Sequence, residues 1–145
     1  MIFTEVKGDL FTAPQGYYLA HCISGDYALG AGIAKKFNEV YNMRYKLHKN
    51  YPIPDGEAFD NVTLALLVDN VFNLVTKPRC YHEPRYEDIR LALEDMRDQC
   101  EENDIEHLAM PKIASGLDRK EWHIVKGIIE DVFADMNMDI LIYEL

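Results

Sequence analysis

The chain has 145 residues, of which 48% are hydrophobic, and its formal net charge is −10. This length fits one domain over residues 1–145, and the hydrophobic share is large enough for a buried core, which excludes a disordered chain. The acidic balance argues against sequence-independent binding to nucleic acid, because such binding depends on Lys and Arg neutralising phosphates. No apolar run approaches the ~20 residues that a membrane span needs, so we expect no membrane contact.

The cysteines indicate the compartment in which the protein works. Cys22, Cys80 and Cys100 are odd in number and scattered, which is typical of reduced thiols rather than of a disulfide framework or a zinc site. The first residues lack the basic start and apolar stretch of a signal peptide. We therefore expect a cytoplasmic protein without a metal or other cofactor, and the acidic surface favours a soluble monomer.

Strands and helices alternate along the chain. Strands are expected at 2–7, 17–22, 62–68, 71–76, 106–110 and 138–144, and helices at 32–41, 44–50, 85–103 and after residue 121. The third and fourth strands are separated only by Asp69-Asn70, which predicts a hairpin. This order predicts an α/β fold in which helices cover both faces of a central sheet of about six strands.

The stretch from Ala20 to Phe37 combines a strand end, a loop of small residues and a helix start. Backbone N–H groups at a helix N-terminus are unpaired and carry a partial positive charge, so this stretch predicts an anion site. The Gly30-Ala31-Gly32 step is not a full dinucleotide-binding fingerprint, because Lys35 stands three residues after the second glycine. A tight turn between strand and helix is the alternative interpretation.

Four loops follow strand ends, at 8–11, 23–32, 77–84 and 111–118. In open α/β sheets, ligands bind outside the carboxyl ends of the strands, so we expect these loops at one edge of the sheet. Two of them lead into helices, so that two helix N-termini could face one diphosphate. The last two loops each offer one titratable candidate, Lys77 and Asp118.

Each candidate also has a purely structural interpretation. A lysine at a strand end, such as Lys77, is usually a solvated surface residue. Asp118 and Glu121 have the spacing of a capping box, in which the carboxylates bind backbone N–H groups at a helix start. Asp9, just after the first strand, has the position of a residue that caps a turn.

The sequence around three further residues indicates that they lie in the core rather than at a ligand site. His21 lies between Ala20 and Cys22 and has the pattern of a satisfied strand histidine. Cys22 points to the opposite face of the strand and is expected to be a buried, unreactive thiol. Tyr143 on the last strand is expected in the core more than against a ligand.

Together these loops resemble a macrodomain. The resemblance is carried by V-K-G-D-L-F at 6–11, A-H-C-I-S at 20–24, G-A-G-I-A at 30–34, T-K at 76–77 and M-P-K-I-A-S-G-L-D at 110–118. Within this family, the chain resembles the branch of the terminal ADP-ribose protein glycohydrolases. That branch is related to the DNA–ADP-ribose hydrolases of bacterial toxin–antitoxin pairs. The resemblance implies a three-layer α/β/α sandwich with a mixed sheet.

The resemblance also implies a ligand, ADP-ribose, and a set of contacts to it. The adenine group is expected beside Asp9, Leu10 and Tyr143. The loop at 24–32 is expected to wrap the distal ribose and the diphosphate, and the loop at 114–117 to hold the diphosphate from the other side. The full implied set is Asp9, Leu10, His21, Ser24, Gly30, Ala31, Gly32, Ile33, Ile113, Ala114, Ser115, Gly116, Leu117 and Tyr143.

In this branch a lysine and an aspartate carry the chemistry, and they fall on Lys77 and Asp118. A neutral lysine amine would attack C1″ of the distal ribose, and the aspartate would move protons. The implied function is a hydrolase that removes ADP-ribosyl groups from protein carboxylates or nucleobases, with ADP-ribosylated protein or nucleic acid as substrate. Alternatives are an ADP-ribose 1″-phosphate phosphatase, an O-acyl-ADP-ribose deacylase, and a non-catalytic ADP-ribose-binding module.

Overall fold

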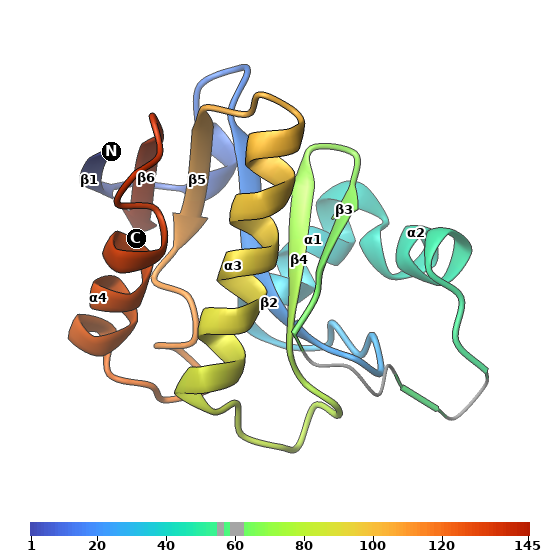
Figure 1. Ribbon diagram of the computed structural model, residues 1–145. Helices are drawn as coiled ribbons and strands as arrows, with labels where there is room; N and C mark the ends of the chain where they lie inside the picture. Colours follow the sequence, from blue (N-terminus) through green and yellow to red (C-terminus); the bar gives the residue numbers. More distant parts are fainter. Residues whose placement is uncertain (55–56, 59–62) are drawn as a thin grey trace.

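A computed structural model of the protein describes residues 1–54, 57–58 and 63–145. In these residues, strands form a sheet in the order β1–β6–β5–β2–β4–β3 (Figure 1). The strands are β1 (Ile2–Lys7), β2 (Tyr18–Ser24), β3 (Ala65–Val68), β4 (Val71–Lys77), β5 (His107–Pro111) and β6 (Asp139–Glu144). Only β3, which runs antiparallel to β4, departs from the parallel direction of the other described neighbours. The sheet is therefore mixed.

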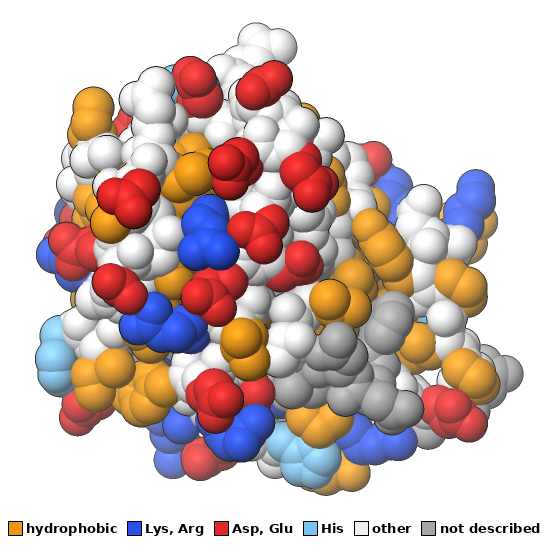
Figure 2. Space-filling model, viewed as in Figure 1, with side chains coloured by type: hydrophobic (Ala, Val, Ile, Leu, Met, Phe, Trp, Pro, Cys, Tyr) orange, Lys and Arg blue, Asp and Glu red, His pale blue; other side chains and the backbone are white. Residues whose placement is uncertain are grey.

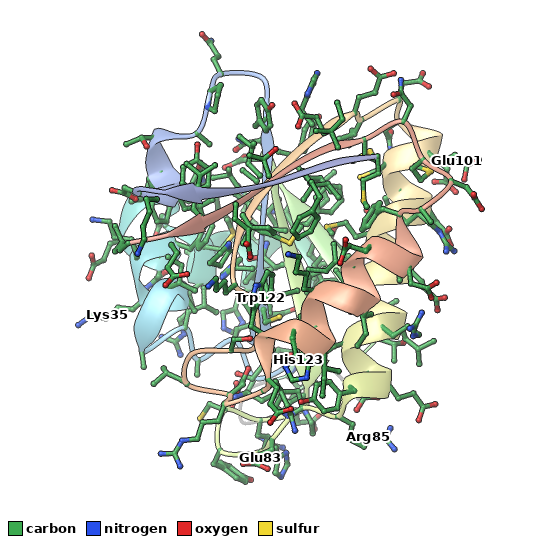
Figure 3. The ribbon with its side chains drawn as sticks, turned by 90° about the vertical axis from the view of Figure 1, so that its left-hand side faces the viewer. Lys35, Glu83, Arg85, Glu101, Trp122 and His123 are labelled. Atoms are coloured by element: carbon green, nitrogen blue, oxygen red, sulfur yellow. The ribbon has the colours of Figure 1, made fainter. Side chains whose placement is uncertain are left out.

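Helices cover both faces of this sheet. They are α1 (Gly32–Tyr41), α2 (Met43–Asn50), α3 (Tyr86–Glu102) and α4 (Trp122–Val132), with a short 3-10 helix, η1 (Leu10–Thr12). Figure 3 shows the sheet between α1 on one side and α3 and α4 on the other. The predicted three-layer α/β/α sandwich is confirmed.

The core forms on each face because apolar side chains recur at helical spacing. On α3, Ile89, Leu93, Met96 and Cys100 all face the sheet and are fully or almost fully buried. On the opposite face, Phe37 of α1 packs in a second cluster with residues of α2, β2 and β4. The two clusters fix the sheet between the helix layers, so the carboxyl ends of its parallel strands form a defined edge.

The hairpin turn at 69–70 is as predicted, and Asp69 adopts a left-handed φ of 53° there. The predicted start of the third strand at Val62 lies outside the described residues, and β3 begins at Ala65. The second strand runs two residues further than predicted, to Ser24. Element ends elsewhere coincide with the prediction or differ by one residue, which is within the usual fraying of helix and strand ends.

The pairing of β2 with β4 changes register at its carboxyl end. Ile23 pairs with Val75, but the next residue, Ser24, pairs with Lys77. Thr76 is thus an extra residue in β4, which is the arrangement of a β-bulge. This irregularity lies directly beside the edge where the predicted site residues meet.

Acidic side chains dominate one face of the molecule. Figure 2 shows Asp and Glu side chains spread over α3, in keeping with the net charge of −10. Among the described residues, each helix is too short or too polar to cross a bilayer.

Candidate functional site

Three loops at the carboxyl ends of β2, β4 and β5 surround a cavity of about 670 Å³. The predicted site residues that line it are Ser24, Gly30, Ala31, Gly32, Ile33, Lys77, Ile113, Ala114, Gly116, Leu117 and Asp118. The loop at 8–11 does not line this cavity, because β1 lies at the edge of the sheet with β6 between it and β5. A more open cavity of about 830 Å³ beside α2 contains none of the predicted site residues.

Lys77 and Asp118 form an ion pair inside the 670 Å³ cavity. Lys77 is the last residue of β4, and its Nζ lies 2.6 Å from Oδ1 of Asp118, which follows β5. Both side chains keep only 15% of their surface exposed. Lys77 is therefore not a solvated surface lysine. An amine beside a proton acceptor in a half-buried pocket is the arrangement that nucleophilic catalysis needs.

The capping-box interpretation of Asp118 is wrong. Helix α4 begins at Trp122, and its N-cap residue is Glu121, whose side chain makes no cap hydrogen bond. Arg119, between the two carboxylates, has a left-handed φ of 57°, which a helix starting at Asp118 would not allow. The Asp118 carboxylate is therefore free of a capping role and faces Lys77.

The loop before α1 presents backbone donors to the cavity. Helix α1 begins at Gly32, and its N-cap Ala31 has no side chain that could cap the first turn. Gly30, Ala31 and Gly32 are exposed and line the cavity. Unpaired N–H groups at this N-terminus, together with the helix dipole, make it suited to a diphosphate.

Two buried side chains that sequence reasoning missed hold this loop in place. Tyr27 and Leu29 have left-handed φ values of 54° and 42°, and both are buried. The Tyr27 hydroxyl donates to the carbonyl oxygen of Tyr51 at 2.9 Å, and Arg44 Nε donates to the Tyr27 carbonyl oxygen at 3.0 Å. The sequence does indicate that these two residues are buried, because Tyr27 and Leu29 are large apolar residues within a run of small ones.

The loop after β5 forms the opposite wall of the cavity. Ile113 and Ala114 are buried, and Ala114 has a left-handed φ of 60°. The Lys120 N–H donates to the Ala114 carbonyl oxygen at 2.8 Å and so closes the loop. Ser115 is not among the residues that line the cavity, and its hydroxyl donates to the Ile113 carbonyl oxygen at 3.2 Å.

The expectation of a second helix N-terminus at the cavity is wrong. The lining ends at Arg119, before α4 begins at Trp122 (Figure 3). The N–H of the N-cap residue Glu121 instead donates to the hydroxyl of Tyr86 at 3.1 Å. The backbone of the loop, rather than a helix end, therefore faces the cavity on this side.

The residues predicted for the adenine group lie outside the cavity lining. Asp9 caps η1, because its Oδ1 accepts a hydrogen bond of 3.0 Å from the Phe11 N–H. Leu10 and Tyr143 are buried, and the Tyr143 ring lies 3.9 Å from the position of a Cβ on Gly8. The structure thus shows the turn-capping role of Asp9, and the adenine contact stays a prediction.

His21 is among the ligand-binding residues that the resemblance implies, and the structure corrects this. Its side chain is fully buried, stacks on Phe37 with 3.9 Å between ring centroids, and pairs through Nε2 with Asn73 Oδ1 at 2.6 Å. Burial lowers its pKa to about 4, so the ring is neutral. The ring is therefore a buried strand histidine, as in the alternative interpretation, but only Nε2 is satisfied, because the buried Nδ1 has no hydrogen-bond partner among the described residues.

Cys22 points to the other face of β2, as expected for neighbouring strand residues, and lies in the cavity lining. Burial, and after it the negative charge of Asp118, raises the pKa of its thiol to about 12. The thiol is therefore protonated at neutral pH and is no nucleophile.

Comparisons with known proteins agree with this geometry. A family model described as Macro domain matches residues 21–129. The ADP-ribose glycohydrolase OARD1 of Bos taurus is 41% identical over 98% of this chain and 91% of its own length.

Solved structures show the same fold. The macrodomain of Thermus aquaticus DarG is 21% identical, with a TM-score of 0.84 over 99% of each chain. A structure of Thermosipho africanus DarTG in complex with ADP-ribose is 19% identical, with a TM-score of 0.73 over 98% of this chain and 41% of that one. The family model matches most of the chain, and the OARD1 relative aligns with nearly all of it. Together with the arrangement of sheet, loops and cavity, these matches show that the chain belongs to the macrodomain family.

Proposed function

We propose that this protein is a hydrolase that binds ADP-ribose in the 670 Å³ cavity and removes ADP-ribosyl groups from protein carboxylates or nucleobases. The observation that carries the proposal is the ion pair of Lys77 and Asp118, 2.6 Å apart inside that cavity. The 41% identity to an ADP-ribose glycohydrolase along nearly the whole chain supports the same reaction class.

The cavity walls suit the parts of ADP-ribose. In this proposal, the backbone N–H groups at 30–34 bind the diphosphate at the N-terminus of α1. The loop at 113–117 binds it from the opposite side, and the distal ribose lies between the two walls beside Lys77 and Asp118. The adenine group extends toward Asp9 and Tyr143, beyond the cavity.

The chemistry has two steps. Asp118 accepts a proton from the Lys77 ammonium, and the neutral amine attacks C1″ of the distal ribose. The N–C1″ bond forms as the bond from C1″ to the carboxylate oxygen or nucleobase nitrogen breaks, and the leaving group takes the electron pair. Water then attacks C1″, the N–C1″ bond breaks, and ADP-ribose leaves while Lys77 regains its proton.

A parallel assay on two substrates tests the proposal. Protein ADP-ribosylated on glutamate and DNA ADP-ribosylated on a base are incubated with wild type, Lys77→Ala and Lys46→Ala, and released ADP-ribose is measured. Lys46 is a matched control, because its Nζ also lies 2.6 Å from an aspartate, Asp69, but that pair is on the surface. We expect release by wild type and Lys46→Ala on at least one substrate, and none by Lys77→Ala.

The same samples distinguish the alternatives. Normal turnover by Lys77→Ala would disprove the lysine mechanism. Release of phosphate from ADP-ribose 1″-phosphate, or of the acyl group from O-acyl-ADP-ribose, unaffected by Lys77→Ala, would instead select a phosphatase or deacylase that uses activated water. Binding of ADP-ribose in a calorimetric titration, with no turnover of any conjugate, would select a non-catalytic binding module.

We also propose that the protein works as a monomer in the cytoplasm. Cys22, Cys80 and Cys100 are free thiols in the structure, which suits a reducing compartment. Size-exclusion chromatography with light scattering tests the monomer, and fractionation of cells that express the tagged protein tests the location.

A further inference from the structure

The carboxylate of Asp26 joins two of the three loops that surround the cavity. Its Oδ1 accepts hydrogen bonds from the hydroxyl of Ser24, the last residue of β2, at 2.5 Å and from the Ala28 N–H in the loop before α1 at 3.2 Å. Its Oδ2 accepts a hydrogen bond of 3.0 Å from the N–H of Cys80, which lies 54 residues further along the chain. One side chain therefore fixes the loop before α1 and also connects it to the loop after β4.

The connection is close to Lys77. The Gly25 N–H donates to the Lys77 carbonyl oxygen at 2.9 Å, and the Cys80 N–H reaches Asp26 three residues later. The chain is thus bound to the loop before α1 both at Lys77 and just after it. Burial alone would raise the pKa of Asp26, but the hydrogen bonds from Ser24, Cys80 and Ala28 together hold it below its usual value. The carboxylate is therefore ionised at neutral pH and accepts through both oxygens.

We propose that Asp26 is a positioning residue, which fixes the loop after Lys77 against the loop before α1 and so keeps the Lys77 amine in line with the bound sugar. This inference rests on the proposed function for its effect on turnover. The carboxylate bonds to the two loops rather than to the Lys77 amine or the Asp118 carboxylate, so it acts through the backbone. A misplacement of about 1 Å at a reacting group costs on the order of a hundredfold in rate, which makes such a contact consequential.

The substitution Asp26→Asn separates the two contacts of the carboxylate. The asparagine carbonyl oxygen can still accept from Ser24 and Ala28. Its amide nitrogen is a donor and cannot accept from the Cys80 N–H, so only the connection between the loops is lost. Asp26→Ala removes both contacts. Asp131→Asn is a matched control, since Asp131 is an exposed aspartate that pairs with Arg90 on the helix layer, away from the cavity.

The test combines amide hydrogen exchange by NMR, titration with ADP-ribose, and steady-state kinetics on the preferred ADP-ribosylated substrate. In Asp26→Asn we expect the Cys80 amide to exchange about tenfold faster or more, because a charge-assisted hydrogen bond is lost, while Ala28 is unchanged. We expect kcat to fall about tenfold or more and ADP-ribose affinity to stay within about threefold. Asp26→Ala should also weaken ADP-ribose binding, and Asp131→Asn should match wild type.

Three outcomes would overturn the proposal. They are an unchanged Cys80 exchange rate in Asp26→Asn, an unchanged kcat, and a general increase in exchange across the sheet, which would indicate a global stability effect. If wild type turns over no substrate, the proposed function fails instead. The exchange of Cys80 then still decides whether Asp26 fixes the loop.

Discussion

Gly32 and Leu117 face each other so closely that a Cβ atom on Gly32 would lie 3.0 Å from Leu117 Cδ1. Gly32 begins α1, and Leu117 lies in the loop after β5, so two loops distant in sequence meet over the cavity. Gly32 also has a left-handed φ of +59°, which side chains rarely adopt. Glycine is required here both by the backbone conformation and by the narrow space between the two walls.

Substitution Gly32→Ala should lower ADP-ribose affinity about tenfold or more, because the added methyl group and the left-handed strain of about 1 kcal/mol both disturb the diphosphate wall. Calorimetric titration measures the affinity. The double variant Gly32→Ala/Leu117→Ala should recover part of it, since the shorter side chain leaves room for the methyl group. Unchanged affinity in the single variant would contradict this account of the wall.

A second glycine substitution should have the opposite effect on stability. Gly127 lies within α4 and is exposed, and a Cβ atom added to it would meet no atom within 4 Å apart from its chain neighbours and the backbone of its own helix. Gly127→Ala should stabilise the protein by about 1 kcal/mol through helix propensity, which corresponds to a rise of roughly 3 °C in Tm. Differential scanning calorimetry checks this, and ADP-ribose affinity should not change. A lower Tm would show that the helix is strained at this position.

The buried neutral ring of His21 predicts acid sensitivity. Its pKa is about 4 in the folded protein and 6.5 in the unfolded chain, so between these values the unfolded chain binds a proton that the folded one does not. Stability contributed by this group is complete above pH 6.5 and falls as the pH drops toward 4, by about 3 kcal/mol in all. Urea denaturation across this range measures the slope.

The matched variant is His21→Gln, whose amide can still donate to Asn73 Oδ1 but does not titrate. We expect it to be less stable than wild type at neutral pH and to lose less stability on acidification. Equal slopes for the two proteins would mean that other groups, chiefly carboxylates, cause the acid sensitivity.

Tyr86 should matter for turnover although it lies outside the cavity lining. Its hydroxyl accepts the N–H of Glu121, and Lys120 Nζ lies 5.1 Å from the centre of its ring. Tyr86→Phe keeps the ring but loses about 1 kcal/mol of hydrogen bonding at the end of the Asp118 loop. We expect a lower kcat with unchanged ADP-ribose affinity, measured by initial rates and titration. An unchanged kcat with a lower Tm would restrict Tyr86 to a role in stability.

Cysteine labelling should separate the three thiols. Burial raises the pKa values of both Cys22 and Cys100 to about 12, whereas Cys80 is exposed. Iodoacetamide at mildly alkaline pH should therefore modify Cys80 well before the other two, as followed by peptide mass spectrometry. Fast modification of Cys22 would show that the cavity opens more widely than the structure indicates.

Much of the fold and part of the site follow from local patterns in the sequence. Apolar spacing identifies the buried face of each element, as the stripe on α3 illustrates, and the loops after β2, β4 and β5 meet because parallel strands end at one edge. Helix α1 begins at Gly32 as predicted, because small residues and a strand end both mark that point. The ion pair of Lys77 and Asp118 is consistent with the two residues chosen from the motifs.

The local patterns do not reveal contacts between segments that are distant in sequence. The Asp118–Glu121 spacing satisfies the capping pattern, but Lys77, 41 residues earlier, is the partner of Asp118. His21 is in a matching motif, yet its ring points away from the cavity and into the layer of α1. The hydrogen bond from the Cys80 N–H to Asp26 cannot be predicted from the residues around either position, because it depends on how two loops pack. The spacing of apolar residues indicates which face of a helix or strand is buried. It does not indicate which residue of a distant segment a side chain will contact.

The extra residue in β4, Thr76, determines toward which face of the sheet Lys77 points. Alternate residues of a strand face opposite layers, so one inserted residue reverses the side to which all later ones point. Pairing runs without interruption up to Val75, and Thr76 then places Lys77 opposite Ser24 instead of opposite Gly25. Regular pairing past Val75, with Thr76 in register, would instead set Lys77 opposite Gly25 and turn its amine toward the other layer. The chemistry therefore depends on how the two strands pair at this point as much as on the identity of the residue.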